Sequence, residues 1–80
     1  MGYHLKKIKK GILGELSKIE EELEEAKDAK EQGVRLMLLI ELSDLIGAIK
    51  AVAEKEGSTL EELIKMAEVT ERAFKSGARK

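Results

Sequence analysis

The fold is decided by residues 36–53, which read LMLLIELSDLIGAIKAVA. The only side chains in this segment that are neither apolar nor glycine are those of Glu41, Ser43, Asp44 and Lys50. A surface helix carries one apolar stripe, whereas a helix that is apolar on nearly every side is buried among other elements. We therefore expect a helix over residues 34–56 that lies centrally in the fold.

A long helix is expected before this segment, over residues 4–31. Its apolar residues recur at steps of three and four and form one stripe: Leu5, Ile8, Ile12, Leu16, Ile19, Leu23 and Ala26. Each glycine inside a helix weakens it by roughly 1 kcal/mol relative to alanine, so we expect a kink or a close contact at Gly11 and Gly14. Gly33 suits the left-handed position that ends a helix.

A third helix is expected over residues 59–76, after Gly57 ends the central one. Ser58 or Thr59 would cap it, and Glu61 or Glu62 would complete a capping box. The apolar residues expected to be buried on this helix are Leu60, Leu63, Ile64, Ala67 and Phe74.

The sequence therefore predicts an all-α fold in one domain, residues 1–80, whose three helices form an antiparallel helical bundle. Three helices do not easily enclose one that is apolar all round, so we expect a second subunit to complete the bundle. A homodimer or a homotetramer would satisfy this requirement. Self-association also agrees with the small size of the chain and its lack of cysteine, because short chains without disulfides bury only a modest core.

Composition excludes several chemistries. The chain has no cysteine and one histidine, His4, so it has no thiol nucleophile and no zinc site of the usual kind. Its 16 acidic and 15 basic residues give a net charge of −1, which argues against a nucleic-acid binder. No apolar run is long enough to span a membrane and no signal peptide is recognisable, so a cytoplasmic protein is expected. Carboxylates must carry any chemistry.

Two carboxylates lie within the apolar segment. Glu41 and Asp44 are three residues apart and therefore neighbours on one helix face. Two like charges in an apolar environment are costly, because burial and mutual repulsion both oppose ionisation. A divalent cation such as Mg²⁺, which prefers carboxylate oxygens, would offset that cost. The alternative is that both side chains face solvent or pair with lysines.

The expected first helix supplies a second carboxylate pair within the run Glu20–Glu25. At about 100° per residue, Glu22 lies at one edge of the apolar stripe and Glu25 further round the same side. Glu21 points away from the core and Glu24 falls on the other flank. Two antiparallel helices that each offer two carboxylates three residues apart can surround one or two ions with four oxygen ligands.

The spacing Glu21-Glu22-x-x-Glu25, fifteen residues, Glu41-x-x-Asp44 resembles the signature of the MazG-like all-α nucleotide pyrophosphohydrolases. The flanking sequence is similar to a short, phage-type branch of that family. This similarity involves residues 14–19, Asp28-Ala29, residues 44–49 and residues 72–77. The resemblance therefore covers nearly the whole chain.

The resemblance implies cleavage of a nucleoside triphosphate to its monophosphate and pyrophosphate, dependent on Mg²⁺ or Mn²⁺. By analogy the metal ligands are Glu22, Glu25, Glu41 and Asp44. The implied catalytic residues are Glu21 and Glu22, with Glu21 either supporting the ligands or positioning water. The alternative is a non-catalytic helical oligomer, either an interaction protein or a nucleotide-binding one, whose carboxylates are structural.

A triphosphate needs positive charge, and the candidate phosphate-binding residues are Lys18, Lys65, Arg72 and Lys75. Lys18 shares the side of its helix with Glu22 and Glu25, and the other three share one side of the third helix. The alternative is that each lies in a solvated helix pair, which would be worth only about 0.2–0.5 kcal/mol. Those pairs are Lys18 with Glu22, Glu61 with Lys65, Glu68 with Arg72, and Glu71 with Lys75.

Overall fold

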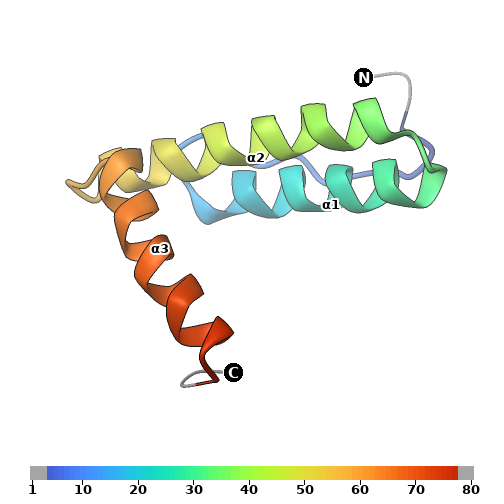
Figure 1. Cartoon of the computed structure of the whole chain (residues 1–80). Coiled ribbons are helices and arrows are strands. Elements are labelled where there is room, and N and C mark those ends of the chain that lie inside the picture. The colour runs from blue at the N-terminus through green and yellow to red at the C-terminus, as the bar shows by residue number, and fades with distance from the viewer. Residues whose placement is uncertain (1–3, 78–80) are drawn as a thin grey trace.

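A computed structural model describes residues 4–77 of the protein. Three helices follow one another along the chain, α1 (Leu16–Gln32), α2 (Arg35–Lys55) and α3 (Leu60–Lys75), and the described residues contain no strand. The predicted all-α fold is confirmed. Helices α1 and α2 form an antiparallel hairpin, and α3 leaves the end of α2 at a steep angle (Figure 1). No helix within residues 4–77 is both long and apolar enough to span a bilayer.

The helix ends predicted from Gly33 and Gly57 are confirmed. Gly33 follows α1 with a φ of 75°, in the left-handed conformation expected there, and the chain turns directly into α2. Gly57 follows α2 with a φ of 82°. Thr59 then caps α3 by accepting a hydrogen bond from the backbone N–H of Glu62 at 3.1 Å. The predicted bounds of the second and third helices therefore agree with the structure to within one residue at each end.

The prediction that the first helix begins at residue 4 is wrong. Helix α1 begins only at Leu16, and residues 4–12, called here the N-terminal segment, run without helical structure alongside the hairpin (Figure 1). Gly14 explains the break, because its φ of 95° lies in a turn that a helix cannot contain. Gly11 explains the close docking, because a Cβ there would collide with the backbone of Ser17 and Lys18.

Hydrogen bonds and ion pairs tie the N-terminal segment to α1. The backbone N–H of Leu5 donates to Asp28, and that of Gly11 donates to Glu21 Oε1 at 2.8 Å. Lys6 pairs with Glu31 at 2.9 Å. The early residues of the segment therefore meet the end of α1 and its last residues meet the start, so the two run in opposite directions.

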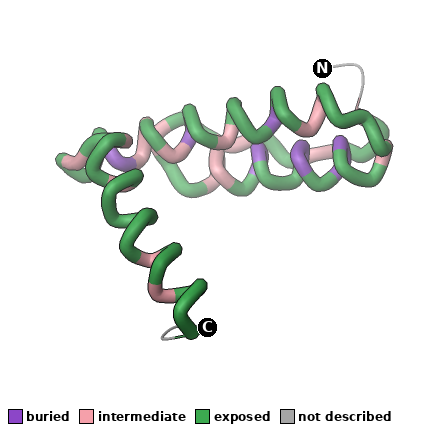
Figure 2. Tube along the Cα trace, viewed as in Figure 1, coloured by how far each residue is buried: buried purple, intermediate pink, exposed green. Residues whose placement is uncertain are grey.

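The buried face of α1 is charged rather than apolar. Among the described residues the buried apolar side chains are all alanines: Ala26, Ala29, Ala48 and Ala53. The predicted stripe is wrong at Leu16 and Leu23, which are 68% and 47% exposed. Carboxylates occupy the buried positions instead, because the N-terminal segment and α2 cover the side of α1 that holds them (Figure 2).

Helices α2 and α3 leave much of their apolar surface uncovered within one chain. Helix α2 contacts both other helices, as expected of a central element, but Leu36, Leu39, Ile40 and Ile46 remain exposed. Helix α3 does not contact α1 and has no buried residue (Figure 2). The predicted burial of its apolar residues is therefore wrong for the single chain, with Leu60, Leu63 and Ala67 exposed or half-buried and Ile64 and Phe74 about half exposed.

Candidate metal centre

A cluster of carboxyl groups lies between α1, α2 and the N-terminal segment. Its buried members are Glu21, Glu22, Glu25, Asp28 and Glu41, and Asp44 lies at its exposed edge. The helical repeat of α1 places its members on adjoining positions of one face, and the turn at Gly33 brings α2 back against that face. The cluster therefore arises from the spacing of the acidic residues along α1, their spacing along α2, and the tight turn at Gly33 that joins the two helices.

The four expected metal ligands are brought together. One carboxylate oxygen each from Glu22, Glu41 and Asp44 lie within 4.8 Å of one another, as do oxygens of Glu21, Glu22 and Glu25. Glu22 belongs to both groups and so joins the carboxylates of α1 to those of α2. This arrangement suits a hard divalent cation, which binds oxygen ligands.

Glu22 contains a buried polar atom that has no partner among the described residues. Its Oε1 pairs with Lys18 Nζ at 3.3 Å, but its Oε2 is buried and has no hydrogen-bond partner among the described residues. The residue as a whole is only 5% exposed. A buried polar atom without a partner typically costs about 1–3 kcal/mol, and more when it is charged. A cation bound at Oε2 would remove that penalty.

The pKa shifts within the cluster show how strongly the groups interact. Burial raises the pKa of Glu25 to about 7, and its hydrogen bond to Glu22 and the charges of Glu22 and Glu41 act in the same direction. The pKa of Asp44 is also raised, by loss of hydration and by the charges of Glu22 and Glu41. Both carboxyls resist ionisation, as expected where negative charge exceeds positive charge.

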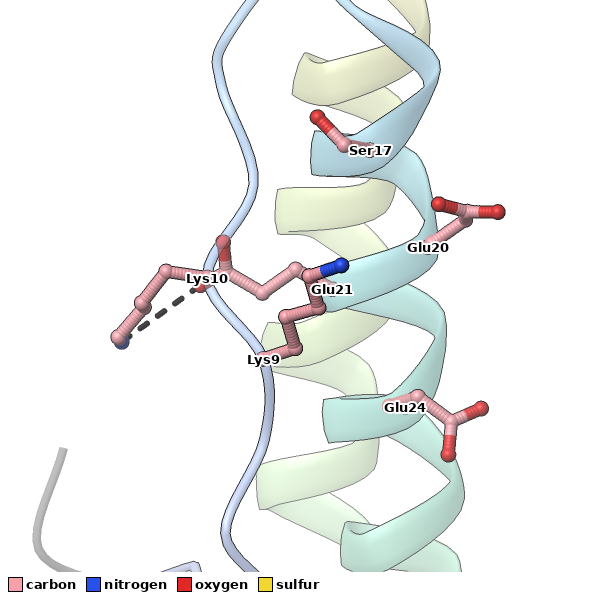
Figure 3. A pocket seen from close by; sticks show the side chains of 6 residues that line it. All are labelled: Lys9, Lys10, Ser17, Glu20, Glu21 and Glu24. Atoms are coloured by element: carbon pink, nitrogen blue, oxygen red, sulfur yellow. Dashed lines mark ion pairs between the residues drawn. The ribbon is translucent and has the colours of Figure 1, made fainter.

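Glu21 differs from its neighbours. Burial opposes its ionisation, but the Gly11 N–H and the Lys18 ammonium group outweigh that effect and lower its pKa. The prediction that Glu21 points away from the core is wrong, because the N-terminal segment covers this side of α1 and buries the carboxylate. Lys10 of that segment lies 3.6 Å from Glu21 Oε2 (Figure 3).

A small cavity lies beside Glu21, between the N-terminal segment and α1 (Figure 3). Lys9 and Lys10 border it on one side, and Ser17, Glu20 and Glu24 on the other. Its volume is about 90 Å³. Ligand pockets are typically about 300–1,000 Å³, so this cavity cannot enclose a nucleotide.

His4 is a member of the cluster that the sequence reasoning missed. Its side chain is 6% exposed, with Nδ1 2.9 Å from Asp28 Oδ2 and Nε2 2.9 Å from Glu41 Oε2. Nε2 also lies 3.7 Å from Glu25 Oε1. Burial opposes the charged imidazolium, but the hydrogen bonds to Asp28 and Glu41 outweigh it and raise the pKa of His4.

One signal in the sequence could have identified the buried acidic face. Glu21, Glu25 and Asp28 follow the i, i+4, i+7 spacing that usually marks the apolar side of a helix. Acidic residues at those positions, beside Ala26 and Ala29, indicate a helix whose buried side is acidic and whose carboxylates need positive or hydrogen-bonding partners. For His4 no comparable local signal exists, because its partners are 24 and 37 residues away in the chain.

The candidate phosphate-binding residues lie in two places. Lys18 lies within the cluster and pairs with Glu21 at 3.2 Å and Glu22 at 3.3 Å. Lys65, Arg72 and Lys75 are exposed on α3, which makes no contact with α1. Lys75 pairs with Glu71 at 2.7 Å, as in the solvated alternative. Within one chain, the basic residues of α3 are therefore not brought to the carboxylates of α1.

Comparison with family models, with curated protein sequences and with solved structures finds no match for this chain.

Proposed function

We propose that the protein is a Mg²⁺-dependent nucleotide pyrophosphohydrolase that cleaves a nucleoside triphosphate to the monophosphate and pyrophosphate. The observation that carries the proposal is Glu22 Oε2, a buried carboxylate oxygen without a partner that lies among the carboxyl groups of α1 and α2. The ligands would be Glu22, Glu25, Glu41 and Asp44. The similarity of the motif to the MazG-like family supplies the reaction, and the donor set supplies the preference for a hard cation.

The bound ion, Mg²⁺ or Mn²⁺, would neutralise phosphate oxygens and make the phosphorus more open to attack. Glu21 and Glu22 would orient the attacking water. Glu21 suits this role because its lowered pKa keeps it ionised, and an ionised carboxylate accepts hydrogen bonds from water. The Gly11 N–H and Lys18 fix the position of this carboxylate.

Lys18 is the best-placed residue of this chain to contact a phosphate. Its Nζ lies between Glu21 and Glu22, and the pKa of Lys18 is raised by its hydrogen bond to Glu21 despite partial burial, so it stays charged. A cation bound to Glu22 would compete for the same carboxylate and leave Lys18 able to bind a phosphate oxygen. Lys65, Arg72 and Lys75 would contribute only if α3 of a second subunit approached the cluster.

A second copy of the chain is part of the proposal. The exposed residues Leu36, Leu39, Ile40 and Ile46 follow helical spacing and form one apolar face of α2. Leu16 and Leu23 of α1 and the apolar side of α3 are also uncovered. A chain whose buried apolar side chains are alanines gains little stability alone, and pairing of two copies would bury these larger side chains.

The test is release of pyrophosphate from a panel of ribonucleoside and deoxyribonucleoside triphosphates with Mg²⁺. We expect turnover by the wild type and a loss of at least about 100-fold in kcat for Glu41→Gln and Asp44→Asn. Glu24→Gln is the matched control, because Glu24 is an exposed carboxylate on α1 that pairs only with Lys27 in the described structure. Equal rates in all four proteins would refute the proposed site.

The uncovered apolar side of α3 favours a second candidate function, a non-catalytic interaction protein. An open groove on that side is bordered by Leu63, Met66, Ala67 and Phe74. Absence of turnover with every nucleotide, together with no effect of Mg²⁺ on thermal stability, would favour this function over the enzyme.

A further inference from the structure

His4 occupies an unusual position for a residue so near the start of a chain. The N-terminal segment carries it over α1, so that its ring lies among Asp28, Glu25 and Glu41. All three partners are buried carboxyl groups, and the Asp28 and Glu41 side chains are only 2% and 1% exposed. The two ring nitrogens need only two hydrogen-bond partners, so a third carboxyl group beside Nε2 is more than anchoring of the segment requires.

The two ring nitrogens have different surroundings. Nδ1 lies 2.9 Å from Asp28 Oδ2, and Asp28 also accepts hydrogen bonds from Gln32 Nε2 at 2.9 Å and from the Leu5 N–H at 3.2 Å. Asp28 is therefore fixed and in turn fixes the ring. A histidine that binds a metal ion through one nitrogen usually donates the N–H of the other to a carboxylate, which sets the tautomer and the orientation of the ring.

The distances at Nε2 suit a bound ion. Two ligand atoms on neighbouring corners of an octahedron lie about 3 Å apart when each is roughly 2.1 Å from the ion. Nε2 is 2.9 Å from Glu41 Oε2 and 3.7 Å from Glu25 Oε1. His4, Glu25 and Glu41 each supply one donor atom, and the three atoms lie within 4.8 Å of one another. Small movements of the Glu25 side chain would therefore place three ligands around one ion.

The excess of carboxyl groups over ammonium groups in the cluster also favours binding of a cation. Within residues 4–77, the side-chain ammonium groups that pair with the cluster are those of Lys18 and, from the exposed side, Lys10, and both pair with Glu21. Glu25 and Asp44 form no ion pair with a lysine or arginine among the described residues, and Glu22 Oε2 is buried there without a hydrogen-bond partner. A divalent ion on this side of the cluster would offset more negative charge than the single charge of an imidazolium ring.

We propose that His4 Nε2 is a metal ligand, and that with Glu25 and Glu41 it forms a mixed nitrogen and oxygen site selective for a first-row transition-metal ion over Mg²⁺. Imidazole nitrogen binds Mn²⁺, Co²⁺ and Zn²⁺, with affinities that rise toward the later metals, whereas Mg²⁺ prefers oxygen. The inference rests on the proposed function for Glu25 and Glu41 as ligands. It adds the nitrogen donor and a higher affinity for transition-metal ions, among them the Mn²⁺ that the proposed function allows beside Mg²⁺.

The chain has one histidine, so its imidazole nitrogens can be observed by nitrogen-15 NMR without an assignment problem. We expect Zn²⁺ to replace the proton at Nε2 and shift that resonance to the position of a metal-bound nitrogen, while Nδ1 keeps its proton and its bond to Asp28. Mg²⁺ at saturation should not produce this shift. An imidazole released into solvent on addition of Zn²⁺, with both nitrogens titrating freely, would overturn the proposal.

Calorimetric titrations of Mg²⁺ and Co²⁺ into the full chain give the second readout. His4→Asn retains an amide that can donate to Asp28 but has no Nε2, and it should bind Co²⁺ about 10–100-fold more weakly while Mg²⁺ affinity changes less than about threefold. Lys6→Ala is the control, because it removes another tether of the same segment, the exposed pair with Glu31, and should leave Co²⁺ affinity unchanged.

The outcomes separate this inference from the proposed function. Equal weakening of both metals in His4→Asn, or tighter Mg²⁺ binding, would overturn the inference and would mean that His4 holds the segment in place or competes with the ion. Nucleotide turnover that survives in that variant would leave the proposed function intact. A histidine-dependent Co²⁺ site in a protein that hydrolyses no nucleotide would support the inference and overturn the enzymatic proposal.

Discussion

At the scale of single residues, the raised pKa of Glu25 makes the stability of the fold depend on pH. This pKa is raised from 4.5 to about 7, so the folded chain holds this proton more tightly than the unfolded chain does. The stabilising contribution of such a group is fully present below pH 4.5 and is lost as the pH rises through about 7. His4 acts in the same direction, because its pKa is raised from 6.5 and its contribution is lost as the pH rises through that higher value.

We therefore predict that, without divalent cations, the free energy of unfolding falls as the pH is raised from about 5 to about 8. On the acid side Glu21 and Asp28 act oppositely, because their lowered pKa values add stability that is lost only as the pH falls through those values. A saturating divalent cation should reverse the loss at neutral pH by taking the place of the bound protons. Denaturation curves of the wild type and Glu25→Gln across this range test the prediction. An identical pH profile in the variant would contradict it.

At the scale of elements, the N-terminal segment determines the environment of the cluster. It buries Glu21, contributes His4 and depends on the absence of a side chain at Gly11. Without it, the outer side of α1 would be an ordinary solvated run of glutamates. The segment thus converts a surface feature into a buried acidic site.

We predict that Gly11→Ala loosens this segment. The added Cβ would collide with the backbone of Ser17 and Lys18, at a cost of about 1–3 kcal/mol, and would weaken the bond from the Gly11 N–H to Glu21. Amide hydrogen exchange should become faster at Leu5 and Gly11, with little change in the middle of α2. Lys7→Ala, an exposed position in the same segment, is the control. Unchanged exchange at Leu5 and at position 11 in Gly11→Ala would show that the segment does not depend on this close approach.

The sequence predicted the helices wherever local signals decide the outcome. Gly33 and Thr59 act on their immediate neighbours, so the turn and the cap could be read directly. The structure of the N-terminal segment could not be predicted in this way. Its apolar residues recur at steps of three and four, which is the pattern of a helix, although the segment is not helical. What holds it in place are contacts such as His4 with Asp28 and the approach of Gly11 to α1, which join residues far apart in the chain.

The clustering of the carboxyl groups was predicted from local spacings, whereas the burial of Glu21 was not. The spacings Glu22 to Glu25 and Glu41 to Asp44 are local, and the antiparallel hairpin brings oxygens of both pairs into one cluster. The orientation of Glu21 was mispredicted because placing residues around a helix at 100° per residue assumes that only the apolar stripe is covered. Here α2 and the N-terminal segment cover α1 from two directions, and no local pattern indicates the second cover.

At the scale of the whole molecule, the exposed apolar faces predict self-association. We expect light scattering across the micromolar range to give the mass of a dimer or tetramer. Ile46→Glu places a charge on the exposed apolar face of α2 and should shift the protein toward the monomer at the same concentrations. Lys7→Gln, at an exposed position of the N-terminal segment, also lowers the net charge by one and is the control for the change of charge alone. A wild type that is monomeric throughout would refute the second subunit.

We propose that the carboxylate cluster and a divalent cation together cleave a nucleoside triphosphate between its α- and β-phosphates. The most direct test is phosphorus-31 NMR of each triphosphate incubated with the wild-type protein and Mg²⁺ or Mn²⁺. We expect at least one nucleotide to yield its nucleoside monophosphate and pyrophosphate in equal amounts with the wild type, and Glu41→Gln to yield neither. Release of the nucleoside diphosphate and inorganic phosphate would contradict the proposal. A wild type that leaves every nucleotide of the panel intact would also contradict it.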